Sequence, residues 1–290
     1  MKKFTATDKW KLAAVMALML ANWGIEAQKW HLSIKHLQKI TYWRSFRAIL
    51  SGISFAVNTP NRTGEYLGRI LYVDEGNRLK AVSITILNSW SQLLITLLTG
   101  CSGLFIFQLY LGKATIEEHG LSIFWMRSLQ WVLIVITVLF MLLYFRLGLL
   151  VSLLERIPLI NKYSRYFNVL QGFRRKELWN MLALSFLRYT VFLAQYLLIF
   201  SVFKVDMSWW EGCLATSVMF LLLAIVPTIA LAELGLRGEI SLQVFGLLTT
   251  NKLGIIAATG AIWFINLLIP AIAGSVLLIG LRIFRKNNIK

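Results

Sequence analysis

The sequence predicts an all-α polytopic membrane protein, with about five full spans plus two re-entrant helical hairpins in an inverted-topology repeat. The first observation is composition: of 290 residues, 58% are hydrophobic and 15% are charged, and the mean hydropathy is +0.67. A soluble core of this size does not need so much apolar surface. The second observation is a pair of apolar segments that are each interrupted by proline and glycine. The third is four apolar windows longer than the roughly 20 residues that cross a bilayer: 81–111, 122–154, 178–203 and 253–283.

The charge is strongly positive, because 30 Lys and Arg residues against 13 Asp and Glu residues give a net charge of +17. The positive residues collect in short segments between the apolar windows, as the positive-inside bias requires, so we exclude a nucleic-acid partner. Segments 29–47 and 155–176 and the basic C-terminal tail are expected to be cytoplasmic. Segment 155–176 interleaves its cations with aromatic residues, which predicts an interfacial helix.

The first span, at about residues 10–30, is more polar than the others. Asn22, Glu26 and Trp30 are spaced by four residues and share one helical face, which we expect to pack inward or to reach the interface. The topology places the N-terminus outside although its lysines favour the cytoplasm. Two explanations fit this conflict: a preceding span is missing from this chain, or the first span follows the positive-inside bias poorly. We favour the first explanation.

The first interrupted segment, residues 45–73, is predicted to be a re-entrant hairpin, because neither of its apolar pieces is long enough to cross. Within "NTPNRTGEYLGR", Pro60 cannot continue a helix and Gly64 permits a turn. The predicted break therefore comprises Thr59, Pro60 and Gly64.

The second interrupted segment, residues 212–250, is long enough to cross once, so topology decides. A single crossing would place the basic C-terminal tail outside, against the charge bias, whereas a hairpin returns it to the cytoplasm. Within "PTIALAELGLRGE", we expect the break at Pro227 and Gly235.

Span, hairpin and span therefore occur twice in opposite orientations within a single transmembrane domain, residues 1–290. We assign the first half to 10–111, the connecting span and basic segment to 112–177, and the second half to 178–290. Paired interrupted segments in two inverted halves indicate a binding site near the middle of the membrane.

Charged residues accompany both breaks, and each would cost roughly 2.5–3.5 kcal/mol at the centre of a bilayer. They must therefore be paired, hydrated or close to a surface. Residues four apart on a helix can pair, as Glu65 with Arg69 and Glu233 with Arg237. The arginines would bind an anionic group such as a lipid phosphate, and the glutamates would hold the arginines or exchange protons. Alternatively, the charges only anchor interfacial hairpin ends to headgroups. The candidate substrate-binding residues are Arg62, Glu65, Arg69, Glu233, Arg237 and Glu239.

No grouping in the sequence is typical of catalysis. Cys101 and Cys213 are far apart, and the three histidines have no metal-ligand spacing. We expect no enzyme activity, no metal and no cofactor.

Three stretches carry a resemblance, in the order "NWGIEAQKW", "TPNRTGEYLGR" and "PTIALAELGLRGE". Over nearly the whole chain they resemble the flippase-like membrane family that includes the transmembrane region of lysylphosphatidylglycerol synthases. Lys29-Trp30 looks like that family's early Arg/Lys-Trp signature. The first turn is similar to its Thr-Pro-Gly-x-x-Gly-Glu type turn, with Asn61 in place of the usual glycine. The late turn is similar to its Gly-x-Arg-Glu type turn, with Gly238 inserted before Glu239.

In multidomain relatives this region is held to move aminoacylated phospholipid between leaflets, and a separate soluble domain performs the aminoacyl transfer. The resemblance therefore implies translocation or handling of an anionic or aminoacylated lipid, without synthesis, in a multi-pass protein of the bacterial cytoplasmic membrane. The alternative is a non-transporting partner that presents lipid to a cytosolic glycosyl- or aminoacyl-transferase through its basic segments. Assembly into a homo-oligomer is also compatible with the sequence.

Overall fold

The computed structural model describes residues 6–57, 59–60, 62–118, 122–158, 164–226 and 230–287, and these residues contain helices but no strand. The first half comprises α1 (Ala6–Ile34), α2 (Tyr42–Ala56), α3 (Gly64–Ile70), η1 (Glu75–Asn77) and α4 (Arg78–Glu118). The middle comprises α5 (Ile123–Phe145), α6 (Leu147–Glu155), α8 (Ser164–Phe167) and η2 (Asn168–Gly172). The second half comprises α9 (Arg175–Val202), α10 (Trp209–Ile225), α11 (Ala230–Phe245), α12 (Lys252–Trp263), the π-helical η3 (Phe264–Leu268) and α13 (Ile269–Asn287).

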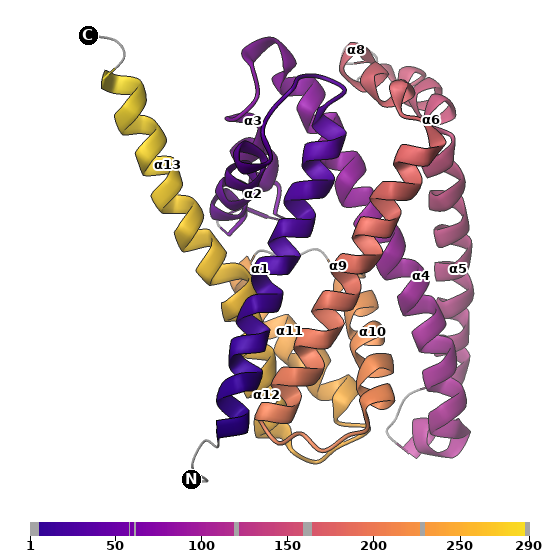
Figure 1. Cartoon of the computed structure of the whole chain (residues 1–290). Helices are drawn as coiled ribbons and strands as arrows, with labels where there is room; N and C mark the ends of the chain where they lie inside the picture. The colour runs from indigo at the N-terminus through magenta and orange to yellow at the C-terminus, as the bar shows by residue number, and fades with distance from the viewer. Residues whose placement is uncertain are drawn as a thin grey trace.

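Long helices run the height of the molecule, with the start of α1 at the lower end and the end of α13 at the upper end in Figure 1. Among the described residues, four segments are long and apolar enough to cross a membrane: Glu75–Gly112, Phe124–Phe145, Arg175–Val202 and Lys252–Gly280. The 29-residue helix α1 runs beside α9 and is long enough to cross, but it is more polar. The all-α polytopic fold is therefore confirmed, and α1 as a fifth span stays a prediction.

Two helical hairpins occupy the interior, and they enter it from opposite ends (Figure 1). The hairpin of α2 and α3 begins and ends at the upper end, whereas the hairpin of α10 and α11 begins and ends at the lower end. The turn of the first lies where the sequence predicts it, since the Thr59 hydroxyl accepts a hydrogen bond from the Gly64 N–H at 2.7 Å. Both hairpins stop inside the bundle, so their broken helix ends face the interior.

Each hairpin packs against a long helix from the opposite half of the chain. Helix α2 contacts α13, where a Cβ on Gly274 would lie 2.0 Å from the backbone oxygen of Leu50. Helix α10 contacts α4, where a Cβ on Gly100 would lie 2.6 Å from the Cβ of Leu221. Glycines at helix crossings let backbones approach closely inside membranes. The two contacts interlock the halves, and we call them the exchanged hairpin contacts.

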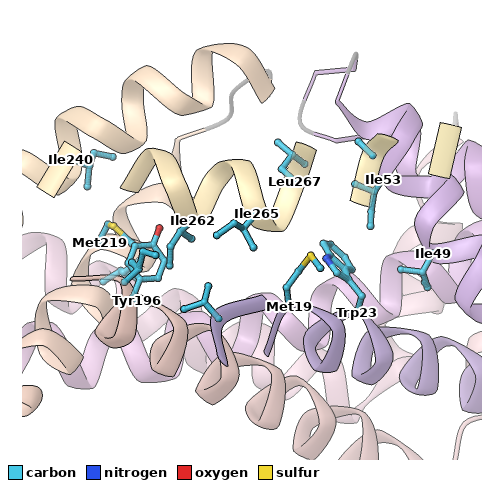
Figure 2. Close-up of a cluster of buried hydrophobic side chains, with 14 of the residues drawn as sticks. Met19, Trp23, Ile49, Ile53, Tyr196, Met219, Ile240, Ile262, Ile265 and Leu267 are labelled. Atoms are coloured by element: carbon cyan, nitrogen blue, oxygen red, sulfur yellow. The ribbon is translucent and has the colours of Figure 1, made fainter. Parts of the chain in front are cut away.

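One hydrophobic core joins the halves. Figure 2 shows buried side chains from α1, α2 and the α12–η3 segment around a shared interior, including Trp23, Ile53 and Leu267. The π-helix here has a local cause: Pro270 has no N–H to donate to the carbonyl four residues earlier, that of Asn266, so the helical ladder is interrupted. The irregular turn lies next to the interior rather than at a surface.

Three details of the sequence prediction were wrong. The predicted span 122–154 is divided at Arg146, whose φ of −121° and ψ of 58° end α5. Segment 155–176, predicted to be an interfacial helix, is not a single helix: its described part contains the end of α6, the short helices α8 and η2 and the start of α9. Pro158 lacks the N–H that would continue α6. Gly235 is not a break: it lies inside α11, where a helix tolerates a single glycine at a cost of about 1 kcal/mol. Pro227 lies outside the described residues.

Candidate functional site

A cavity of about 390 Å³ lies where the two hairpins converge. Its wall comes from α1, α4, α9, both hairpins and the α12–η3 segment, so both halves of the chain contribute. Charged side chains are concentrated on this wall, although the surrounding helices are apolar. They are Glu26, Lys29, Arg62, Glu65, Arg188, Glu233 and Arg237.

One group of charges is centred on Glu26 of α1, whose side chain is only 4% exposed. One of its carboxylate oxygens accepts from Arg69 at 2.9 Å, and the other lies 2.7 Å from Arg188 and 3.0 Å from Lys29. Arg69 also pairs with Glu65 one turn earlier in α3. This Glu26 cluster therefore ties α1 to the first hairpin and to α9.

The cations of the Glu26 cluster are held by further contacts. The Lys29 ammonium donates to the backbone oxygen of Asn88 at 3.2 Å and to the Ser185 hydroxyl at 3.1 Å. The Arg188 guanidinium lies over the Trp23 ring at 5.0 Å and donates to the Asn22 side chain at 2.6 Å. Multiple partners stabilise charges that burial would otherwise disfavour.

A second group of charges is centred on Glu233 of α11 and joins the two hairpins. Arg62, in the turn of the first hairpin, donates to both carboxylate oxygens of Glu233 at 3.0 Å. Arg237 donates to the same carboxylate at 2.5 Å and to the hydroxyl of Tyr196 in α9 at 2.8 Å. The tips of the hairpins therefore meet through a charged contact between residues 171 positions apart.

The turn that carries Arg62 is strained. Arg62 has a φ of 56°, in the left-handed region that few residues other than glycine adopt. Its side chain is 41% exposed, compared with 11% for Glu233. Arg62 is thus the accessible member of this Glu233 cluster.

Part of the remaining wall of the cavity is apolar, with Phe192 of α9, Phe220 and Leu223 of α10, and Leu267. Uncharged polar side chains, among them Asn88, Gln92 and Asn266, complete the lining. A wall with charged and apolar parts suits an amphipathic ligand, with a polar group at the arginines and a hydrocarbon part against the aromatic rings.

The structure brings together five of the six residues that the sequence proposes. Four of them line the cavity, and Arg69 lies directly behind it with 1% exposure, bound to two glutamates. The predicted pairs of Glu65 with Arg69 and of Glu233 with Arg237 are confirmed. Glu239 lies apart: it is exposed, outside the cavity wall, and accepts a hydrogen bond from Gln243 at 2.9 Å.

Sequence reasoning missed three charged residues of the site. Glu26 was expected only to face inward or to reach the interface. Lys29 was expected in the basic cytoplasmic segment, although it is 1% exposed inside the bundle. Arg188 was overlooked inside the apolar window 178–203. An ionisable residue within a span is itself a signal for a functional site, so Arg188 could have been found.

Comparison with protein families gives one match over most of the chain. The family model described as "Lysylphosphatidylglycerol synthase TM region" matches residues 1–274. No curated protein and no solved structure gives a significant match.

Proposed function

The chain belongs to the lysylphosphatidylglycerol synthase transmembrane-region family, and from this premise we propose that it is a flippase-like protein that moves a lipid between membrane leaflets. The transported lipid has an anionic or aminoacylated headgroup, and the membrane is the bacterial cytoplasmic membrane. The role is transport or handling of lipid, with no catalytic step assigned to the charged residues.

The observation that carries this proposal is the contact between Arg62 and Glu233 beside the cavity. It joins the tips of two hairpins that enter from opposite ends, so each tip marks the inner limit of access from one side. When this contact breaks, movement of one hairpin would open the cavity to one leaflet, and movement of the other hairpin would open it to the opposite leaflet. Interrupted helices at a central site are typical of transporters that work by alternating access.

The cavity wall supports a pathway for a headgroup. A headgroup phosphate can bind the guanidinium groups of Arg62 and Arg237 in two-pronged fashion, replacing part of what Glu233 supplies. The acyl chains would stay against the apolar wall or in the surrounding lipid. Because Arg62 and Arg237 both contact Glu233, neither guanidinium is left without a carboxylate partner when the phosphate departs.

The test is leaflet exchange in vesicles that contain the purified chain. Arg62→Ala and Arg237→Ala should each slow exchange of a tail-labelled lipid by about tenfold or more, since a charge-assisted hydrogen bond is worth about 1.5–3 kcal/mol. Arg127→Ala removes an exposed arginine outside the cavity and should leave the rate unchanged. Each variant must stay monodisperse and folded at the assay temperature for the rates to be compared.

The alternative function, presentation of lipid to a cytosolic transferase, predicts a different result. Exchange would then be the same with and without the protein, and substitutions in the basic segments would remove recruitment of the enzyme to vesicles. That outcome would refute transport.

A further inference from the structure

We infer that the cavity selects lipids whose headgroup ends in a phosphomonoester, a doubly charged anion, over phosphodiester and aminoacylated lipids. This inference rests on the proposed function, since it concerns the lipid that the same site takes. It is drawn from the charge balance of the site, from its unpaired hydrogen-bonding atoms and from its apolar wall.

The charge balance is positive. Five cations and three carboxylates form the two clusters, which leaves two positive charges uncompensated among the described residues. The Glu26 cluster and the Glu233 cluster each carry one of them. The members are Lys29, Arg62, Arg69, Arg188 and Arg237 against Glu26, Glu65 and Glu233. A phosphomonoester carries about −1.5 to −2 at neutral pH and offers three acceptor oxygens, whereas a phosphodiester carries a single negative charge.

The three carboxylates of the site already bind cations of the protein. Both oxygens of Glu26 and both oxygens of Glu233 bind cations, and Glu65 binds Arg69. The ammonium group of an aminoacylated headgroup would therefore add a positive charge to a positive site, in which each of the three carboxylates already binds at least one cation. Charge repulsion in a poorly hydrated interior disfavours such a ligand.

Three buried hydrogen-bond donors of the lining residues have no acceptor among the described residues. In the described part of the chain, Nε of Arg237 and the indole N–H groups of Trp23 and Trp263 have no hydrogen-bond partner, and all three residues line the cavity. Trp23 is 5% exposed. The unpaired acceptors on the wall, the side-chain oxygens of Gln92 and Asn266, are neutral. Neighbouring atoms cover these donors, so phosphate oxygens would satisfy them once a side chain of the wall moves aside, which would remove the cost of leaving them unpaired.

Inorganic phosphate shares this chemistry, but the apolar wall favours a lipid. Phe192, Phe220 and Leu223 give the free anion nothing to bind, whereas the first carbons of a lipid tail would remove their surface from water. The experiment therefore includes both sources of the phosphomonoester.

The test uses phosphatidylcholine vesicles with the purified full chain and tail-labelled tracer lipids. Phosphatidic acid, which ends in a phosphomonoester, should exchange about tenfold faster than phosphatidylglycerol and faster still than lysylphosphatidylglycerol. Unlabelled phosphatidic acid should compete, and inorganic phosphate at the same concentration should not. Equal rates for the three tracers, or competition by inorganic phosphate, would overturn the inference while leaving transport standing.

A charge-matched pair of variants checks the cause. Arg62→Gln removes one of the two excess charges and should reduce the rate ratio of phosphatidic acid to phosphatidylglycerol about fivefold. Arg127→Gln removes an exposed charge outside the cavity and should keep the parent ratio. An unchanged ratio in Arg62→Gln contradicts the charge argument.

Binding in detergent separates this inference from the proposed function. Short-chain phosphatidic acid should raise the melting temperature of the chain more than short-chain phosphatidylglycerol does. If no lipid exchanges but this difference persists, transport is refuted and the selective site remains. If neither lipid stabilises the chain, the site itself is refuted.

Discussion

Replacing Glu26 by glutamine should be among the most destabilising single changes in this protein. The substitution keeps the size of the side chain but removes the charge that three cations share at distances of 2.7–3.0 Å. Lys29 and Arg69 are each 1% exposed, so water cannot replace the lost carboxylate. Three positive charges would then share the single remaining carboxylate, that of Glu65.

The size of the effect follows from the burial. Removing one partner of a buried ion pair typically costs about 3–5 kcal/mol, because the other charge stays buried and uncompensated. One kcal/mol shifts the melting temperature of a large domain by about 2 °C or more, so Glu26→Gln should melt at least about 6 °C lower than the parent chain. Tryptophan fluorescence during heating in detergent measures the shift. Glu155→Gln, at an exposed position at the end of α6, is the matched control and should not shift the melting temperature.

A second substitution distinguishes charge imbalance from lost packing. Combining Glu26→Gln with Arg188→Gln removes one surplus cation, so the double variant should melt higher than the sum of the two single effects predicts. Strictly additive losses, or a shift of less than about 2 °C for Glu26→Gln alone, would refute the reasoning that the Glu26 cluster holds α1, α3 and α9 together.

Further predictions concern the hairpin contacts. Gly274→Val should abolish monodisperse protein in gel filtration, because its Cβ would lie 2.0 Å from a backbone oxygen, whereas Gly280→Val, with open space around it, should behave as the parent. Arg62→Glu should slow lipid exchange about tenfold or more by placing two carboxylates together, and adding Glu233→Arg should recover part of the rate; no recovery would contradict a direct contact. Tyr196→Phe removes the hydroxyl that accepts a hydrogen bond from Arg237 and should lower the free energy of unfolding by about 1 kcal/mol. The melting temperature should then fall by about 2 °C, and an unchanged melting temperature would contradict that hydrogen bond.

Much of the fold could be predicted because the signals were local. Pro60, Gly64 and the short apolar pieces around them determine a break, and the structure has its turn there. The charge bias of the loops then distinguished a second hairpin from a single crossing. The prediction of a break at Gly235 was wrong because a glycine ends a helix only where the backbone adopts a conformation that other residues disfavour. Gly235 lies inside α11, and no neighbouring atom crowds it.

The site was harder to predict, because its contacts are set by distant parts of the chain. The pair of Glu65 with Arg69 could be predicted from helical spacing, but that of Arg62 with Glu233 depends on how two hairpins approach each other. Lys29 was misplaced because a lysine at the end of an apolar window can either reach the surface or fold back to a buried carboxylate. Glu26, one turn earlier on the same helix, favours the buried position, and the contacts with Asn88 and Ser185 come from distant parts of the chain.

The exchanged hairpin contacts form late in biosynthesis, because each joins a helix to one that is made much later or earlier in the chain. Chains are made from the N-terminus at about 5–20 residues per second, so Arg62 enters the membrane on the order of ten seconds before its partner, which lies 171 residues later. The packing surface for α2 on α13 arrives later still. Until Glu233 is made, the first hairpin lies in the bilayer with Arg62 unpaired, and the face of α2 that packs against Gly274 stays uncovered until α13 is made. A stop codon just before α13 would leave Arg62 paired but this face of α2 uncovered permanently, so a chain that loses only its last helix should be degraded faster than the full chain.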